Sequence, residues 1–390
     1  MNKDEGQNLL IIGAPEHDAN AYHLSGFLAP DAVICLRVAG KKYLAVSSLE
    51  YGRAEKQAPV DELLSHEELG IIELARELKS GARAYGAAVA NLLDELGASD
   101  SPIVVPADFG VGFADELRAR GITLTPDGKL FDGLRRAKTE EEISNIEKTQ
   151  NAVEAACVLA VDILKESGIN EDGTLEWRGE TLTSELLRAE IDVELLRRGC
   201  AADGTIVAGG PQAADPHERG HGPLKAGESI IVDIFPIDIS TRYYSDMTRT
   251  FVRGEPNEGL QEMYDAVLAS QEAALSTIRA GVNGKDVHSE VAEVLHEAGY
   301  KTNVHDQQEG KPLTEGFFHG TGHGVGLEIH EAPRVSLADV ELVPGDVVSV
   351  EPGVYDPNVG GVRIEDLVVV TEEGCRNLTK FPKEFRIEPE

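Results

Sequence analysis

Residues 319–331 read HGTGHGVGLEIHE and carry three histidines, His319, His323 and His330, among four glycines. Glycines at this density let the backbone approach a metal ion or a substrate closely. The stretch is not a phosphate-binding loop, because no Lys followed by Ser or Thr completes one, and it contains no HExxH pair. Three histidines so close together indicate a functional site, in which only one or two of them need contact a metal.

Four acidic residues stand in apolar, strand-like sequence on either side of this stretch. They are Asp233 in IIVDIFP, Asp246 in YYSDMTRTF, Glu351 in SVEPGVY and Glu365 in GVRIEDL. Burying a lone carboxylate is costly unless it is paired or bound to a cation. Four carboxylates with the imidazole of His323 are too many ligands for one small cation and suit two. Two metals roughly 3.5–4 Å apart can activate a water between them, so the pattern predicts hydrolysis.

The acids come in two pairs, each on a predicted hairpin. Residues 229–235 and 241–251 read as the arms of the first, and 346–355 and 361–370 as the arms of the second, which the turn DPNVGG joins. Side chains alternate between the two faces of a strand. We therefore expect each hairpin to present its two acids to a common site.

The same alternation predicts which side chains accompany the acids. Arg242, Tyr244 and Asp246 should share one strand face, and Arg363 should share a face with Glu365. An arginine on the ligand side can orient a carboxylate without touching the metal, which is the role we expect for Arg363. An ordinary ion pair is the alternative.

Length and composition indicate a globular protein of two domains. The chain has 390 residues, of which 41% are hydrophobic, and no apolar run is long enough for a membrane helix. The charged start MNKDEGQ is unlike a secretory signal. The four cysteines form no close pair, so they predict neither disulfides nor a thiolate metal site. A reduced, cytoplasmic location is therefore expected.

The charge of the chain is strongly negative. A formal net charge of −33 results from 69 acidic against 36 basic residues. Nucleic-acid binding requires a basic surface, so that partner is not expected. Self-repulsion of this size destabilises a compact chain at low salt, and molar salt screens it. The composition thus indicates a halophilic protein in a salt-rich cytoplasm, with an acidic mesophilic protein as the alternative.

Residues 8 to about 130 alternate strand and helix patterns, which predicts an α/β domain with a partly parallel sheet. Thr139 and Glu142 form the capping box of a new helix, so the domain boundary is placed at 134/135. Residues 168–180, with the single Trp, read as an exposed loop. Further helices are expected at about 181–198, at 259–280 and from an N-cap near Asp286.

The order Asp…Asp…His…Glu…Glu, with GHG, EPG and RIED around the last three, resembles the pita-bread metallopeptidase family, in particular its Xaa-Pro dipeptidases (prolidases) and Xaa-Pro aminopeptidases. The resemblance covers about 135–380. Residues 1–134, with YHLSGF and SLEYGRAE, resemble a creatinase/prolidase-type N-terminal domain. The implied fold is α+β: an N-terminal α/β domain, then a catalytic domain (135–390) with a curved antiparallel sheet flanked by helices. Residues 234–245 are longer than in many members.

The family pattern implies a role for each ligand. Asp233 would bind one metal, Asp246 and Glu365 would bridge both, and His323 with Glu351 would complete the second. Glu351 would also be the base for the bridging water. By the same resemblance, His217, in DPHERGHGPL, and His330 would stabilise the tetrahedral intermediate, with His319 nearby.

The predicted function is hydrolysis of the bond between an N-terminal residue and proline, in di- or oligopeptides. The resemblance also implies a homodimer. The ligand set suits Mn²⁺ or Co²⁺, with Fe²⁺ or Zn²⁺ as alternatives. Three other functions compete. A methionine aminopeptidase of this fold usually lacks an N-terminal domain, a creatinase-like hydrolase does without the metal set, and a non-catalytic binding module generally loses ligands. Dipeptidase and aminopeptidase stay unresolved.

Overall fold

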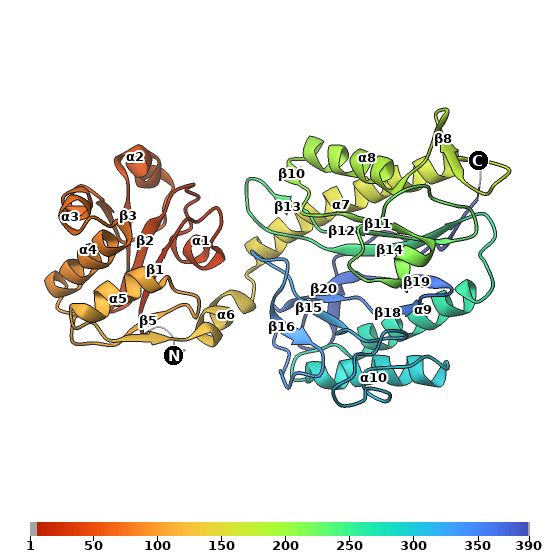
Figure 1. Ribbon diagram of the computed structural model, residues 1–390. Helices are drawn as coiled ribbons and strands as arrows, with labels where there is room; N and C mark the ends of the chain where they lie inside the picture. The colour runs from red at the N-terminus through yellow and green to blue at the C-terminus, as the bar shows by residue number, and fades with distance from the viewer. Residues whose placement is uncertain (1–5, 389–390) are drawn as a thin grey trace. The chain divides into compact units, whose positions relative to one another are not determined.

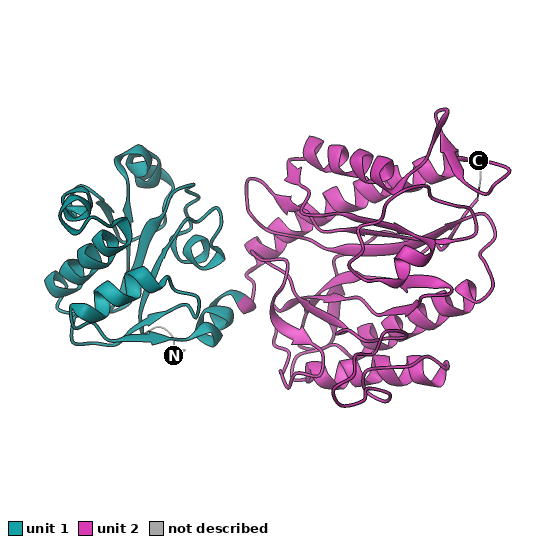
Figure 2. Cartoon of the chain, in the orientation of Figure 1, with its two compact units in different colours: residues 1–135 teal, residues 136–390 magenta. Residues whose placement is uncertain are grey.

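The computed structural model describes residues 6–388. The chain divides into two compact units, residues 1–135 and 136–390 (Figure 2). Whether the two units fold independently, with a boundary at 134/135, stays a prediction. Within the described residues, no helix combines the length and the apolar character that a membrane span requires.

The N-terminal unit is built on one six-stranded sheet with the order β4-β3-β2-β1-β5-β6. β1, β2 and β3 pair antiparallel, whereas β4, β5 and β6 each run parallel to a neighbour. The strands are β1 (Asn8–Gly13), β2 (Val33–Val38), β3 (Lys41–Val46), β4 (Glu62–Ser65), β5 (Ile103–Val105) and β6 (Leu124–Pro126). The helices are α1 (Ala19–Ser25), α2 (Ser48–Gln57), α3 (Ile71–Leu78), α4 (Gly81–Glu95), α5 (Val111–Ala119) and α6 (Gly128–Arg136). The predicted partly parallel α/β sheet is confirmed.

Both faces of this sheet are buried, because β1 is apolar at every central position. Leu9 and Ile11 pack with α1 on one face, whereas Leu10 and Ile12 pack with Ala88 of α4 on the other. A strand covered on both sides reads as a continuous apolar run, as NLLII does.

The C-terminal unit contains two larger sheets, ordered β11-β12-β14-β22 and β16-β15-β17-β20-β21. Apart from the parallel β14/β22 pair, neighbouring strands in them are antiparallel. The first comprises β11 (Ile206–Gly209), β12 (Ser229–Ile234), β14 (Met247–Arg253) and β22 (Arg386–Ile387). The second comprises β15 (Gly322–Gly324), β16 (Glu331–Val335), β17 (Val347–Val350), β20 (Asp366–Val370) and β21 (Cys375–Asn377).

Two pairs of helices cover these sheets (Figure 1). The helices are α7 (Glu140–Glu166), α8 (Ser184–Arg197), α9 (Leu260–Thr277) and α10 (Gly284–Glu297). α7 and α8 share a core with β12 and β14, and α9 and α10 share one with β17 and β20. The predicted capping box is present, since Thr139 and Glu142 exchange both bonds at the start of α7. The unit therefore has the predicted architecture of antiparallel sheets flanked by helices.

The first predicted hairpin is correct in its pairing but wrong in the extent of its second arm. β12 pairs with β14, and Asp233 faces Thr248. Residues 241–246 are not strand, and Arg242 adopts a φ of 63°. The prediction that Arg242, Tyr244 and Asp246 share a strand face is therefore wrong. The reason is the long connection: β13 (Ile237–Asp238) turns away to pair with β10 (Cys200–Ala201).

Three further predictions need correction. The second hairpin is split, because β17 pairs with β20 while β18 (Gly353–Asp356) pairs with β19 (Gly360–Arg363). Residues 168–180 are not a loop: they contain strands of the small sheet β7 (Gly168–Ile169), β8 (Leu175–Trp177) and β9 (Glu180–Thr181), and Trp177 is buried against α7 and α8. The N-cap of α10 is Asn283, whose side chain accepts from Lys285 N, and not Asp286.

Candidate metal centre

The ends of five strands bring the predicted ligands to one cavity of about 790 Å³. Asp233 lies near the end of β12 and Asp246 immediately precedes β14, so the antiparallel pairing of these strands places both acids at one edge. Glu351 directly follows β17, and Glu365 directly precedes β20, the strand that pairs antiparallel with β17. His323 is the central residue of β15, beside β17.

The glycines beside His323 are required by the close approach of neighbouring strands. A Cβ on Gly322 would lie 1.9 Å from the carbonyl oxygen of Ser349, and one on Gly324 would lie 2.3 Å from that of Ala332. No larger residue fits at either position without moving a strand. The glycines in GHG thus let β15 seat the imidazole of His323 deep between β16 and β17.

The ligand atoms converge at distances suited to cations. His323 Nε2 lies 3.3 Å from Glu351 Oε1 and 3.7 Å from Asp246 Oδ2. One ligand atom each from Asp246, His323 and Glu365 lies within 4.8 Å of the others, and all three residues are buried. Such a set can hold a metal ion.

Unpaired carboxylate oxygens support the same conclusion. Asp233 Oδ1, Asp246 Oδ1 and Glu365 Oε1 are buried, and each lacks a hydrogen-bond partner among residues 6–388. Leaving a buried polar atom unpaired is costly, and here three of them border one cavity. The residues present therefore fit the divalent ions that the ligand pattern predicts.

Electrostatics point the same way. Burial, followed by the charges of neighbouring carboxylates, raises the pKa values of Asp246 and Glu365 well above their usual range. Burial also raises the pKa of Asp233, although the Arg363 guanidinium opposes it. Burial acts in the same direction on Glu351, but the hydrogen bond and charge of His323 outweigh it and lower the pKa to about 2. A cluster that disfavours its own negative charge is a strong attractor for cations.

Arg363 contacts one of the acids, Asp233, and two neighbouring hydroxyl groups. Its Nη2 donates to Asp233 Oδ2 at 2.7 Å, its Nη1 donates to the Tyr355 hydroxyl at 3.0 Å, and its Nε donates to Thr248 Oγ1 at 3.2 Å. Asp233 is thereby held by one oxygen, while the other is buried and has no hydrogen-bond partner among residues 6–388. This geometry is compatible with the orienting role predicted for Arg363, which stays a prediction.

The three other histidines line the same cavity but differ in their surroundings. His330 meets the ring of His323 edge-on at 4.3 Å, and its pKa is lowered to about 4, first by desolvation and then by the charge of His323. His217 is exposed. His319 already uses both ring nitrogens, with Nδ1 2.7 Å from the Gly320 carbonyl and Nε2 3.0 Å from the Tyr355 hydroxyl. His319 is therefore engaged by the protein through both ring nitrogens, and its catalytic role stays a prediction.

Residues 217–221, HERGH, match the HExxH pattern of mononuclear zinc proteases. That pattern binds zinc only when a helix places both imidazoles on one face, and this segment contains no helix. His221 instead lies 3.8 Å from Glu218 on the surface. The segment therefore contributes His217 alone to the cavity.

Several residues in or next to the cavity wall were not predicted from the sequence. Tyr355 connects His319 to Arg363, and Thr248 connects Arg363 to Glu365. Arg334, four positions after His330, borders the cavity with an exposed guanidinium that makes no hydrogen bond or ion pair with residues 6–388. The signal for Arg334 was its place in EAPR directly after the histidine stretch. Apolar side chains complete the wall: Ile206, Phe235, Phe318 and Ile329.

Comparison with known proteins defines the class to which this fold and centre belong. Residues 144–372, more than half of the chain, match metallopeptidase family M24. The chain belongs to metallopeptidase family M24. The pita-bread fold and the metallo-exopeptidase class predicted from the sequence are thus confirmed.

Individual relatives agree with this assignment. An Xaa-Pro dipeptidase of Pyrococcus furiosus is 34% identical over 260 residues, 66% of each protein. An Xaa-Pro dipeptidase of Pyrococcus horikoshii is 28% identical over 99% of this chain and 96% of that protein. The crystal structure of an X-Pro aminopeptidase from Thermotoga maritima superposes with a TM-score of 0.78 at 26% identity, covering 98% of this chain and 97% of the other.

Proposed function

We propose that this chain hydrolyses the bond between an N-terminal residue and a following proline. The observation that carries the proposal is the group of three buried, unpaired carboxylate oxygens around His323 at the base of an open cavity. Asp233, Asp246, His323, Glu351 and Glu365 would hold two divalent ions. The chemistry that such ions supply when bound is a water of lowered pKa and a polarised peptide carbonyl. Mn²⁺ or Co²⁺ suits this oxygen-rich set, and Fe²⁺ or Zn²⁺ are the alternatives.

The protein groups divide the remaining work. The lowered pKa of Glu351 favours its ionised form, so this carboxylate can accept the proton of the attacking water. His330 and His217 border the cavity and can donate hydrogen bonds to the oxygen that becomes negative during attack. Arg363 keeps Asp233 in place through their 2.7 Å contact. Phe235 and Phe318 provide an apolar surface for a proline ring.

Arg334 favours a dipeptidase over an aminopeptidase. In a dipeptide the proline carries a free carboxylate, which needs a cation, whereas in a longer peptide that position is a neutral amide. Arg334 offers an unpaired guanidinium at the cavity wall, and arginine binds carboxylates in a two-pronged geometry. We therefore propose Ala-Pro-like dipeptides as the preferred substrates.

The test is hydrolysis of Ala-Pro and Ala-Pro-Ala after loading with Mn²⁺ or Co²⁺, in low and in molar KCl, with Asp246→Ala as the negative control. Cleavage of Ala-Pro alone is expected, and cleavage of both would indicate an aminopeptidase. Hydrolysis of a Met-initiated peptide without proline, or of creatine, would indicate another hydrolase of this fold. Full activity of Asp246→Ala, or binding of Ala-Pro without turnover, would contradict the proposal.

We also propose a homodimer that works in a salt-rich cytoplasm and binds neither nucleic acid nor membrane. The net charge of −33 supports the salt requirement, and the four cysteines, all of which are free, suit a reducing compartment. Light scattering after gel filtration in molar KCl tests the oligomer. A monomer in gel filtration would contradict the proposed homodimer. Full activity in low salt would contradict the proposed salt requirement.

A further inference from the structure

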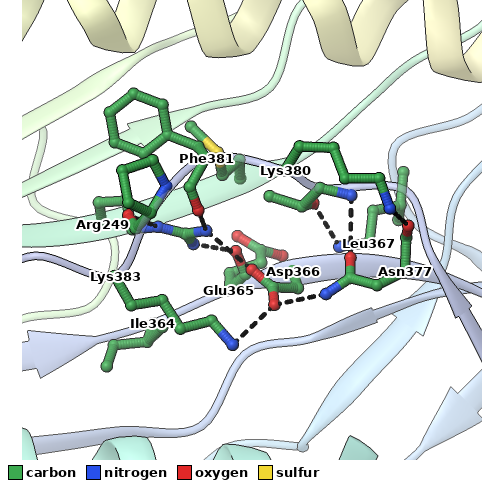
Figure 3. Close-up of polar contacts among 12 residues, drawn as sticks. Arg249, Ile364, Glu365, Asp366, Leu367, Asn377, Lys380, Phe381 and Lys383 are labelled. Atoms are coloured by element: carbon green, nitrogen blue, oxygen red, sulfur yellow. Dashed lines mark hydrogen bonds and ion pairs between the residues drawn. The ribbon is translucent and has the colours of Figure 1, made fainter.

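Directly behind Glu365 lies a buried ion pair between Arg249 and Asp366. Arg249 Nη2 and Asp366 Oδ1 are 2.9 Å apart, and each side chain is only 1% exposed (Figure 3). Neither residue lines the cavity. A buried charge pair is weak evidence for stability by itself, because desolvation can cancel the attraction. Its position next to a proposed metal ligand calls for a more specific account.

Arg249 uses all five of its N–H groups. Nε donates to the Pro382 carbonyl at 3.1 Å, and Nη1 donates to the carbonyls of Thr248 and Glu365 at 3.0 and 2.6 Å. Nη2 donates to Asp366 Oδ1 and to the Phe381 carbonyl at 2.8 Å. Only the planar guanidinium has five donors in a fixed arrangement. Arg249 therefore joins β14, the start of β20 and the segment 381–382.

Asp366 extends this junction on its other side. Its Oδ2 accepts from Asn377 Nδ2 and lies near Lys383 Nζ, each at 2.8 Å (Figure 3). Both partners belong to the chain that follows β20. We call Arg249, Asp366, Asn377 and Lys383 the clamp.

The backbone of Glu365 has particular need of external support. β19 ends at Arg363 and β20 begins at Asp366, so Glu365 lies where the chain passes from one sheet to another and no strand ladder holds it. Its N–H donates to the Thr248 carbonyl at 3.0 Å, and its carbonyl accepts from Arg249. Both main-chain groups of this ligand are thus fixed by two consecutive residues of β14.

We propose that the clamp positions Glu365 for metal binding and thereby sets the affinity of the centre for its ions. The inference rests on the proposed function, because it assumes that Glu365 is a ligand. Residues that orient ligands typically change metal affinity 10- to 100-fold when replaced. A purely structural ion pair would instead change folding stability and leave the affinity of the folded protein unchanged.

The experiment measures Mn²⁺ binding to metal-free protein by isothermal titration calorimetry. The variants are Arg249→Lys, which keeps the charge but offers three donors, and Lys383→Met, which removes one outer contact. Lys148→Met is the matched control, since Lys148 binds the buried Asp238 at 2.8 Å in the same unit but away from the cavity. Circular dichroism and thermal unfolding of each metal-free variant report the structural part.

We expect Mn²⁺ affinity to fall about 10- to 100-fold in Arg249→Lys and about 3- to 10-fold in Lys383→Met, with no change in Lys148→Met. Wild-type affinity in the folded clamp variants would overturn the inference. If Arg249→Lys does not fold, Lys383→Met decides alone. Wild-type protein that binds no Mn²⁺ would overturn the proposed function itself, which separates the two failures.

Discussion

Thr248 donates a hydrogen bond from its hydroxyl to Oε2 of Glu365 at 2.8 Å, from the position on β14 that faces Asp233. The hydroxyl leaves Oε1 of Glu365 as the buried oxygen that has no hydrogen-bond partner among residues 6–388. Thr248, which does not line the cavity, is therefore expected to set the orientation of the Glu365 carboxylate.

Thr248→Val should lower Mn²⁺ affinity about 10-fold or more, because valine keeps the shape of threonine but cannot hold Oε2. Calorimetric titration of the metal-free protein measures the effect. Thr149→Val is the control: its hydroxyl is also buried, but it bonds the carbonyls of Asn145 and Tyr243 away from the cavity. Equal affinities in the two variants would contradict the role of Thr248.

Asp246→Asn should stabilise the metal-free protein by about 1–2 kcal/mol, since it removes one of several buried negative charges that repel each other. It should also abolish the stabilisation that Mn²⁺ gives the wild type. Thermal unfolding in chelator and in Mn²⁺ measures both.

Asp238→Asn is a control of opposite sign. Burial acts to raise the pKa of Asp238, but hydrogen bonds from Lys148 and Ser240 outweigh it and lower the pKa to about 2. This carboxylate is therefore well stabilised, and its loss should destabilise the fold. Destabilisation of the metal-free protein by both substitutions would argue against charge repulsion at Asp246.

Arg334→Leu should raise KM for Ala-Pro about 10- to 100-fold and leave kcat nearly unchanged, because a charge-assisted hydrogen bond contributes about 1.5–3 kcal/mol. Ala-Pro amide, which lacks the carboxylate, is the matched substrate and should show little change. Equal losses on both substrates would remove Arg334 from substrate selection. Arg334→Lys should restore part of the affinity.

Stability should depend on pH through His288, a buried histidine of α10 that is not one of the proposed ligands. Its Nδ1 lies 2.9 Å from Thr321 Oγ1 and its Nε2 3.1 Å from Asn303 Oδ1. Burial lowers its pKa from 6.5 to about 4, and His319 is the titratable neighbour that adds to this effect. Protonation therefore favours the unfolded state, so stability is lost as the pH falls from about 6.5 to about 4.

The loss attributable to His288 should reach about 3 kcal/mol, at 1.36 kcal/mol for each pH unit of the shift. The measurement is urea unfolding of wild type and of His288→Gln at several pH values. The free energy of unfolding of the wild type minus that of His288→Gln should decrease toward low pH. The other titrating groups are the same in both proteins, so their contributions cancel. A pH-independent difference would contradict the assignment.

Molar KCl should raise the melting temperature by several degrees, because it reduces the Debye length to about 3 Å and screens the net charge of −33. The rise in melting temperature for each increment of KCl should be largest at low KCl concentrations, because the screening of the net charge saturates as more salt is added. Sucrose of matched osmolality is the control for general exclusion effects. A melting temperature that is insensitive to KCl would favour the acidic mesophilic alternative.

The local patterns that predicted the fold are those with strong physical causes. The capping box at Thr139 follows from local hydrogen bonding between residues three positions apart, and it is present. The acids in apolar strands pointed to residues of the cavity for a similar physical reason. A buried carboxylate such as Asp233 needs a cation or hydrogen-bond donors, whatever the arrangement of the strands.

What the sequence could not show depends on tertiary contacts. The turn of residues 235–246 toward β10 was hidden, because Asp238 pairs with Cys200, which lies 38 positions earlier in the chain. Trp177 looked exposed because its loop-like neighbours are polar, although in the fold it is buried against α7 and α8. Thr248 and Arg249 were read only as strand residues, since their bonds to Glu365 and Asp366 join segments distant in the chain.

The clamp is completed late in protein synthesis, because Lys383 is the last of its residues to be made. Phe381, Pro382 and Lys383 follow every proposed ligand in the chain, yet they bind the Arg249 and Asp366 side chains of the clamp. Domains generally fold as units during synthesis, the N-terminal part first, so we expect the N-terminal unit to fold while the ligands are still being made. The centre is complete only after residue 383 has emerged. Metal uptake is therefore expected to be a late step, which occurs on an already compact protein and selects among the ions that the cell offers at that moment.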